Sequence, residues 1–578
     1  MASESKSEAW KEKAAAKRTA TLSKIRAEWR LSSDDMDRAK QQLNLSGPFM
    51  QQFLDDTEIS ITQLDSVPLV EAIKSREYTA VQVATAFCHR AAVAHQINNC
   101  LLEIFFDQAL NRAAYLDEYL TTHNKTLGPL HGLPISLKDQ FHVKGVDTTQ
   151  GYVGWIGSNL GIKDPSEAHQ VESQIVTELL SLGAVLYCKT SVPQTLLFGE
   201  TKNNIIGETR NPKNQNLSCG GSSGGEGALL SLRGSTLGIG TDIGGSLRIP
   251  AAYNGIYSIK PTPERLSYRN VANTNPGQNT YRSTVGFMST SLDGLELGMR
   301  AVLSTSPWLR DPAVIPVEFR QQIYNDVSSR AESDGAAKAS AKPLKLGVLW
   351  NDRIVEPHPP IKRGLQMVVD AVRSAGHKVV DWNPPAHSEA ARIHLAFLLA
   401  DGARHVHDQL ALSGEPLIPE LQKFLELKDP MGLLEYQDLT LKGLEYEAGY
   451  TDYWNSTADE DGQIVDAFVM PVRPHAASIA GKTFHTVYTQ VVNCLNYSAV
   501  TFPVTEADRD IDIPDPSYEP MNPKDKMNWE AYDLDVYHGA PVGLQIVARK
   551  FEEEKILAIA KIVCAALATS REREGGNG

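Results

Sequence analysis

The sequence predicts an α/β protein in which a mixed β-sheet core is covered by helices on both faces, behind an N-terminal helical arm. Short apolar runs alternate with longer segments whose apolar residues recur at helical spacing, which is typical of a sheet with helices on its faces. The 578 residues, 42% of them hydrophobic, are enough for a large core. No Pro-, Gly- and Ser-rich linker divides the chain, so we expect one large unit at residues 67–578 and an arm at residues 1–66.

The arm is expected to be helical over residues 8–43, where Ala, Lys, Glu and Arg dominate. Trp10, Leu22, Ile25 and Trp29 are the anchors that would hold it. We favour docking on the body, or on a second subunit of a homodimer, over contact with a membrane surface. Because the arm precedes every motif described below, we expect it to be an appendage outside the functional machinery.

The body is predicted to alternate between helices and strands. Two helices lie within Val67–Ala94, and Thr79 caps the second. The elements expected after them are strand Leu101–Phe106, helix Gln108–Leu120, the apolar run Pro134–Leu137, helix Val171–Leu182, strand Ala184–Tyr187, strand Leu344–Leu349, helix Lys362–Ala375, strand Lys378–Val380, and the apolar runs Phe468–Pro471 and Val542–Val547. Ser328–Lys342 and the acidic, Pro-rich stretch Glu506–Tyr537 are expected to be surface segments.

Charge and composition exclude several classes of protein. The formal net charge of −14 argues against a nucleic-acid partner, which calls for a basic surface. No stretch of about 18 apolar residues predicts membrane insertion, and the charged N-terminus lacks the apolar core of a secretory signal. The six cysteines are scattered without C-x-x-C spacing, which indicates reduced core residues of a cytoplasmic protein.

The densest pattern in the chain is a run of ten glycines, interspersed with serines, between Cys219 and Ser246. Such a density indicates that backbone approaches something closely. A P-loop is excluded because no G-x-x-x-x-G-K-[ST] occurs. A dinucleotide fingerprint fails because Ile243 stands where the third glycine after Gly238 and Gly240 is required. A backbone site for an oxyanion beside a serine remains, and this is the apparatus of acyl transfer.

Three segments, in order, resemble the amidase signature family. LHGLPISLKDQ contains Lys138, GGSSGG contains Ser222 and DIGGSLR contains Ser246, and the interval between the two serines also matches the family. The resemblance extends over roughly residues 70–565, with GAPVGLQIVAR near its end. The phrase LKDQFHVKGVDTTQGYVG is most similar to fungal acetamidase-type members, which are related to fatty acid amide hydrolases. The resemblance implies the amidase signature fold.

The resemblance also implies acyl transfer by a Ser-Ser-Lys triad. Ser246 would be acylated, Ser222 would relay protons and Lys138 would be the base. A lysine can act as a base when burial keeps it neutral, because desolvation lowers its pKa. No histidine lies in the glycine-rich block to form a Ser-His pair. In the family the relay serine follows a cis peptide bond, here Gly221–Ser222.

An oxyanion hole is expected at the turn before the nucleophile. Two consecutive glycines let the turn bend so that backbone N–H groups converge. The N–H groups expected to contribute are those of Ile243, Gly244, Gly245 and Ser246.

Three further residues are expected to support this loop without taking part in the chemistry. They are Ser223, Asp242 and Arg248, of which the last two would otherwise form a surface ion pair. The catalytic residues also have commoner roles when taken singly, as a solvated lysine, a turn serine and a helix N-cap. We favour the catalytic interpretation because those commoner roles would have to hold at three positions in the family's order.

Two other hydrolase patterns are weaker. Residues 220–224 match G-x-S-x-G, but the polar TRNPKNQNLSC precedes them where that motif requires a buried strand. His405 and His407 lie in a helix-like stretch, where residues two apart point to different faces and cannot share a metal. We therefore expect neither a metal nor an organic cofactor.

The substrate stays open at the level of sequence. The family handles short aliphatic, aryl or indole, and fatty acid amides, so the resemblance implies a small-molecule amide that is cleaved to an acid and ammonia or an amine. Leu196, Leu197 and Phe198, within Thr190–Thr201, suggest an apolar pocket wall by analogy. A glutamine-hydrolysing subunit of a transamidation assembly is the alternative, although the N-terminal arm favours a stand-alone hydrolase.

Overall fold

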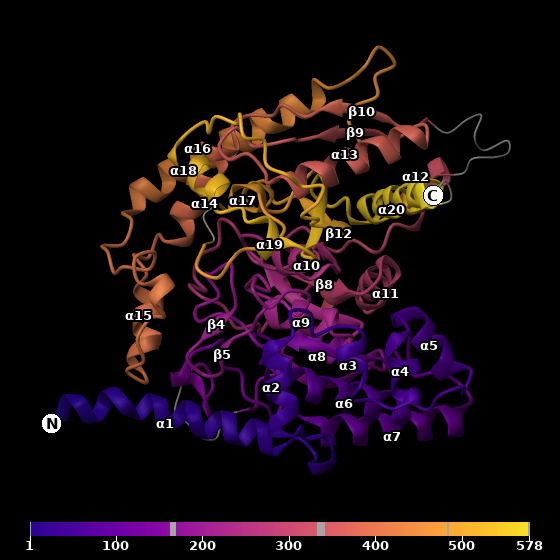
Figure 1. Ribbon diagram of the computed structural model, residues 1–578, viewed down its shortest axis with the longest axis vertical. Helices are drawn as coiled ribbons and strands as arrows, with labels where there is room; N and C mark the ends of the chain where they lie inside the picture. The colour runs from indigo at the N-terminus through magenta and orange to yellow at the C-terminus, as the bar shows by residue number, and fades with distance from the viewer. Residues whose placement is uncertain (1, 162–168, 332–341, 483–484, 576–578) are drawn as a thin grey trace.

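The computed structural model describes residues 2–161, 169–331, 342–482 and 485–575 (Figure 1). Eleven strands of the described chain form one mixed sheet, and two more form a small separate sheet. Helices surround the large sheet, so the predicted fold class is confirmed. None of the helices in these ranges is long and apolar enough to cross a membrane.

The strands of the large sheet are β1 (Leu101–Ile104), β2 (Pro134–Lys138), β3 (Val185–Thr190), β6 (Leu237–Asp242), β7 (Tyr257–Lys260), β8 (Thr284–Ser289), β9 (Lys345–Val348), β10 (Lys378–Asp381), β11 (Ala467–Pro471), β12 (Ser498–Glu506) and β13 (Pro541–Ala548). Their order across the sheet is β1-β3-β2-β6-β8-β7-β12-β13-β11-β9-β10. The small sheet pairs β4 (Lys202–Asn203) with β5 (Gly207–Glu208). In the large sheet β2 is parallel to β3 and β6, β9 is parallel to β10 and β11, and the other pairs are antiparallel.

The helices of the first half are α1 (Ala2–Ser23), α2 (Ser33–Gln41), α3 (Pro48–Gln51), α4 (Asp56–Gln63), α5 (Ser66–Lys74), α6 (Ala80–Asn98), α7 (Phe106–His123), α8 (Gln174–Ser181), α9 (Gly224–Ser231) and α10 (Arg248–Asn254). Those of the second half are α11 (Leu292–Leu303), α12 (Gln321–Ser328), α13 (Pro359–Ser374), α14 (His387–Leu398), α15 (Arg404–Ala411), α16 (Leu433–Asn455), α17 (Val487–Cys494), α18 (Pro523–Glu530), α19 (Leu534–Tyr537) and α20 (Glu553–Gly575). Short 3-10 turns lie at Ala27–Trp29, Val153–Trp155, Pro307–Leu309, Ser329–Ala331 and Pro419–Leu421.

Helices pack on opposite faces of the sheet. A Cβ atom added to Gly543 of β13 would meet Ala252 of α10, whereas the adjacent Val542 lies against Gly364 of α13. Successive residues of a strand point to opposite faces, so α10 and α13 cover different sides. Helix α9 packs beside α10, and α20 packs beside α13.

The arm differs from the single helix predicted over residues 8–43. That range is divided among α1, the 3-10 turn at Ala27–Trp29 and α2, and the arm also contains α3 and α4. The second helix begins where the Ser32 hydroxyl accepts a hydrogen bond from the N–H of Asp35, which gives the break a local cause.

Most of the predicted anchors hold the arm against the body. Ile25 and Trp29 are buried, and Trp10 is partly buried in an apolar cluster. Trp29 stacks on His89 of α6, with 5.2 Å between the ring centroids. Leu22 is wrong as an anchor, because it is 44% exposed. Helix α1 runs along the lower edge of the molecule in Figure 1, so the arm covers apolar surface on the body.

The body elements follow the predicted alternation, with corrections at some ends. The pair α5 and α6 is confirmed, and the Thr79 hydroxyl accepts from the N–H of Gln82 as the cap of α6. The first strand is shorter than predicted, because Phe106 already belongs to α7.

The predicted surface segment Glu506–Tyr537 is mostly exposed or half-buried, and it contains α18 and α19. It is tied to the body through Asp525, whose buried carboxylate accepts hydrogen bonds from the backbone N–H of Glu356 and from the Tyr518 hydroxyl. Most of the predicted loop Ser328–Lys342 lies outside the described residues, and its start is helical.

Gly543→Ala should lower the free energy of unfolding by about 1–3 kcal/mol, because overpacking a close contact displaces backbone or side chains. The added methyl would lie 2.6 Å from Cα of Ala252, a backbone atom that cannot rotate away. Gly449→Ala is the matched control. It lies on an exposed part of α16 with nothing within 4 Å, so it should be neutral or stabilising by up to about 1 kcal/mol. Urea denaturation measures both, and an unchanged midpoint for Gly543→Ala would contradict the packing described above.

Candidate active site

The site is built at the carboxyl ends of two parallel strands. Lys138 is the last residue of β2, and Thr241 lies near the end of β6, which pairs with β2 in parallel register. The Lys138 amine is 2.8 Å from the Thr241 hydroxyl oxygen and 2.8 Å from the Ser222 hydroxyl oxygen. Thr241 in turn donates to the side-chain oxygen of Gln140 at 2.6 Å. The structure therefore brings Lys138 and Ser222 together, across 84 residues of sequence.

Lys138 is fully buried, and no salt bridge to it is present in the described part of the chain. Burial lowers the pKa of Lys138 to about 7, although the charges of Asp242 and Glu226 act to raise it. At and above neutral pH, half or more of the protein molecules therefore carry Lys138 in its neutral form. A neutral amine has a lone pair, which is what a base requires.

The two serines lie on loops that meet at one cavity. Ser222 precedes α9, and Ser246 lies between β6 and α10. The N–H of Ser223 donates to the backbone oxygen of Ser246 at 3.2 Å, which joins the loops. Both hydroxyl-bearing residues, together with Gln140 and Thr241, line a narrow cavity. The peptide bond Gly221–Ser222 is cis, as the family resemblance implied.

The backbone before Ser246 turns sharply at Gly245, whose φ of 122° is a conformation that other residues rarely adopt. The N–H of Gly245 donates to Asp242 at 2.9 Å. The N–H groups of Ile243, Gly244 and Ser246 have no acceptor among the described residues. These three groups are therefore the ones that the turn leaves to a ligand, whereas that of Gly245 is already engaged.

A buried ion pair fixes this turn. Asp242 and Arg248 are both fully buried, with 3.0 Å between Oδ1 and Nη2, so the alternative of a surface ion pair is wrong. The Asp242 carboxylate also accepts from the N–H of Leu247 and from the side chain of Asn493. Burial acts to raise the pKa of Asp242, but the charge and hydrogen bonds of Arg248 outweigh it and hold the pKa well below its ordinary value. Arg248 also donates to Gln545 of β13 at 3.0 Å.

A second cavity of about 150 Å³ opens in front of Ser246. Its apolar lining includes Leu196, Leu197 and Phe198, so the sequence placed the predicted wall correctly. Other parts of the lining come from distant segments, namely Leu395, Leu398 and Phe424 on the apolar side and Arg473, Thr486 and Gln490 on the polar side.

Three residues close to Lys138 were missed at the level of sequence. Thr241 and Gln140 form the hydrogen-bonded chain described above. Glu226 of α9 is buried and accepts from the hydroxyl of Thr190 at 2.6 Å; burial raises the pKa of Glu226 to about 7. Gln140 stands inside the first motif segment, and Thr241 and Glu226 each stand next to one of the other two. Their placement depends on the pairing of β2 with β6, which a motif does not encode.

The structure gives no support to the two competing hydrolase patterns. His407 bonds to the backbone oxygen of Leu425, and the Nδ1 of His405 accepts from the N–H of Asn275. No strand directly precedes residues 220–224, as a nucleophile elbow would require. The described ranges contain no group of three or more His, Cys, Asp or Glu side chains placed to hold a metal ion. The expectation that no cofactor takes part stays a prediction.

The chain is similar to known proteins over most of its length. The family model described as Amidase matches residues 82–557. Two curated relatives named acetamidase are similar over nearly the whole chain. The one from Emericella nidulans is 39% identical over 557 residues, and the one from Aspergillus oryzae is 41% identical over 560 residues; each alignment covers 96% of this chain and 98% of the relative.

The chain is also similar in fold to solved structures. A structure titled fatty acid amide hydrolase superposes with a TM-score of 0.86 at 31% identity, covering 96% of this chain and 95% of its own. A structure of 6-aminohexanoate cyclic dimer hydrolase superposes with a TM-score of 0.67 at 20% identity, which is evidence for the shared fold alone.

The reactivity of Ser246 should follow the neutral fraction of Lys138. The rate constant for phosphonylation by a fluorophosphonate is expected to rise with pH through about 7 and to level off above it, because the lysine pKa is about 7 and only the neutral amine accepts a proton. Lys138→Met should remove this rise. Lys260 provides the control, because it is also buried with a pKa lowered to about 7 by burial but donates to Tyr497. A rise that persists in Lys138→Met and disappears in Lys260→Met would reverse the assignment.

Proposed function

This chain belongs to the Amidase family and is an amide hydrolase, and we propose that it cleaves a small carboxylic acid amide through an acyl-enzyme on Ser246. The observation that carries the mechanism is the buried contact of 2.8 Å between Lys138 and Ser222, beside a cavity that Ser246 also lines. The acetamidase relatives and the family model support the reaction class.

Acylation begins with proton transfer through the relay. The lone pair of neutral Lys138 accepts the hydroxyl proton of Ser222 as Ser222 takes the proton of Ser246. The Ser246 oxygen forms a bond to the amide carbonyl carbon, and the carbonyl π-electrons move onto its oxygen. Thr241 supports this direction of transfer, because its own hydroxyl proton is donated to Gln140 and its oxygen is left to accept from Lys138.

The leaving nitrogen receives a proton by the same path. The tetrahedral intermediate collapses when the C–N bond breaks, Ser222 gives its proton to the nitrogen, and protonated Lys138 restores the proton of Ser222. Ammonia or an amine leaves. Water then attacks the ester on Ser246, the relay takes up and returns one proton, and the acid is released with all three residues in their starting forms.

The negative charge on the carbonyl oxygen would be held by backbone N–H groups. Those of Ile243, Gly244 and Ser246 are the best candidates, since the N–H of Gly245 is engaged by Asp242. Donors of this kind commonly contribute about 3 kcal/mol each to the transition state. Arg248 and Asn493 would act indirectly, by keeping Asp242 and hence the turn in place.

The acyl group would enter the cavity in front of Ser246. Its volume of about 150 Å³ is close to that of a cavity that binds benzene, so short aliphatic and single-ring acyl groups fit. The apolar wall of Leu196, Leu197 and Phe198 supports this choice of substrate. A long fatty acyl chain would have to extend out of the cavity.

Ser246→Ala should abolish amide hydrolysis, with a loss of kcat of about 1,000-fold or more, because it removes the hydroxyl that would be acylated. The assay uses the purified chain alone, which also tests whether a partner subunit is needed. A fluorophosphonate should label the peptide containing Ser246 in the wild-type protein and no active-site peptide in the variant. Labelling of Ser222 in place of Ser246 would contradict the assignment.

The size of the cavity predicts a limit on chain length. Across acetamide, hexanamide, benzamide, indole-3-acetamide and oleamide, kcat/KM for oleamide should fall at least about tenfold below the best short or single-ring amide. The physical reason is that most of the oleoyl chain would remain outside the apolar cavity. A series in which oleamide is the preferred substrate would refute this choice of acyl group without affecting the serine assignment.

A further inference from the structure

Lys17 of the N-terminal arm is buried in the body. Its amine pairs with the carboxylates of Glu103 on β1 and Asp147, the latter at 2.7 Å, and the side chain is only 8% exposed. Glu103 is itself 1% exposed. Its other cation, Lys24, is 3.7 Å away and half exposed, so Lys17 is the principal partner. The arm thus places a charged side chain in the interior of the body. An arm that only docked on the surface would not need such a residue.

Removing that charge would leave buried Glu103 with only the half-exposed Lys24 at 3.7 Å, and Asp147 with only His169, whose Nε2 lies 2.5 Å from Oδ1 of Asp147. Burial raises the pKa of Glu103, and the charge of Lys17 counteracts this rise. An unpaired charge in such a place is strongly destabilising, whereas an exposed pair contributes little. The buried ion pairs of Lys17 therefore hold the arm in a fixed position on the body.

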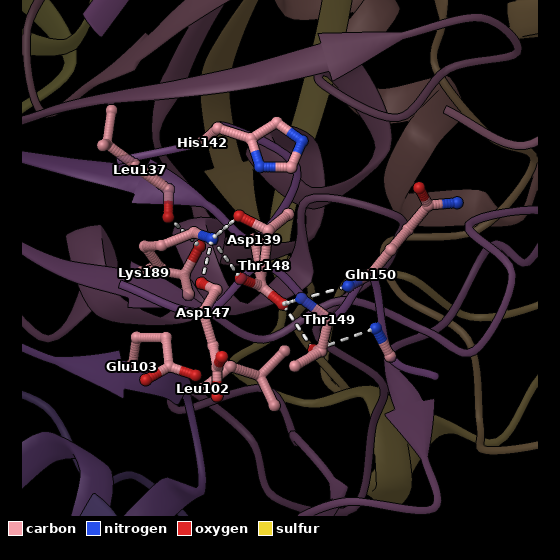
Figure 2. Close-up of polar contacts among 12 residues, drawn as sticks. Leu102, Glu103, Leu137, Asp139, His142, Asp147, Thr148, Thr149, Gln150 and Lys189 are labelled. Carbon is pink, nitrogen blue, oxygen red and sulfur yellow. Dashed lines mark hydrogen bonds and ion pairs between the residues drawn. The ribbon is translucent and has the colours of Figure 1, made fainter. Parts of the chain in front are cut away.

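The contact continues from Asp147 to the catalytic segment. The backbone oxygen of Asp147 accepts from the Lys189 amine at 2.6 Å, and the same amine pairs with Asp139 at 2.6 Å, both ends being fully buried. Figure 2 shows Lys189 between Asp139 and the segment containing Asp147 and Thr148. Asp139 also accepts from the N–H groups of Thr149 and Gln150, and it directly follows Lys138 in the chain.

A second contact joins the same helix to the cavity wall. Ala14 is buried, and Trp10 packs against the apolar cluster that contains Ala14, Val192 and Leu196. Leu196 lines the cavity in front of Ser246. Helix α1 is therefore linked both to the segment of the base and to the wall of the cavity.

We propose that Lys17 is a positioning residue for Lys138, acting through Asp147, Lys189 and Asp139, so that the N-terminal arm belongs to the catalytic unit. This proposal departs from the expectation that the arm is an appendage, and it rests on the role proposed above for Lys138. The division of the chain at residue 67 then describes the order of its elements and does not mark a functional boundary.

The test separates charge balance from positioning with three full-length variants. Lys17→Met should lower both stability and kcat, the latter by about 10- to 100-fold, because small displacements of a catalytic group are costly. KM should change by less than kcat. In Lys17→Met/Glu103→Gln the almost fully buried carboxylate is neutralised and Asp147 keeps His169, so the urea midpoint should recover, whereas kcat stays low because Asp147 still lacks its lysine. Lys11→Met is the control, since Lys11 on the same helix is 61% exposed.

Rates are expressed per site titrated with a fluorophosphonate, so loss of folded protein does not count as loss of kcat. A double variant whose kcat recovers together with its stability would overturn the proposal, as would a single variant with wild-type kcat. Wild-type protein and Ser246→Ala are assayed in parallel. Inactive wild-type protein would count against the proposed function, whereas active wild-type protein with an unaffected double variant counts against the positioning role alone.

Discussion

The candidate site depends on the complete burial of one amine, that of Lys138, at the end of a strand. In the part of the chain that the structure describes, no carboxylate pairs with Lys138, and its neighbours are the hydroxyl groups of Thr241 and Ser222. Burial removes water from the Lys138 amine and no ion pair with a described residue compensates, so the pKa of Lys138 falls to about 7 and its neutral form is favoured above that pH. The surrounding sheet and the glycine-rich loops are the means by which water is kept away from it.

In the described part of the chain, several charged side chains near Lys138, unlike Lys138 itself, are paired with a side chain of opposite charge. Asp242 and Arg248 are as deeply buried as Lys138, yet they face each other and share hydrogen bonds with Asn493 and Gln545. Lys189 and Asp139, next to Lys138 in the chain and the sheet, are also paired. These ion pairs hold backbone in position, whereas among the described residues Lys138 has hydroxyl groups and no carboxylate as its partners. Burial opposite a carboxylate therefore gives an ion pair that holds backbone in place, whereas burial opposite hydroxyl groups lowers the pKa of the lysine.

The sequence was sufficient for the fold class and the alternation of elements, because both are encoded by local patterns. Its motifs also single out Lys138 and Ser222, which the structure places 2.8 Å apart. The sequence was insufficient where a role depends on distant segments. Nothing around Thr241 indicates that it will face a lysine on a parallel strand. Lys17 stands among many charged residues of a helical segment, and only the folded chain shows that Glu103 and Asp147 surround it. The break before α2 was missed for a different reason, since helix-forming composition outweighed a serine cap.

The position of β13 in the sheet has a consequence for synthesis. This late strand lies between β12 and β11, and its Gln545 bonds to Arg248, while Asn493 of α17 completes the brace on Asp242. A growing chain that has already passed Ser246 therefore still lacks the contacts that hold the turn before this serine. Long-range pairings of this kind are intrinsically slow to form. The turn can consequently reach its braced form only after β13 has been synthesised and inserted between β12 and β11.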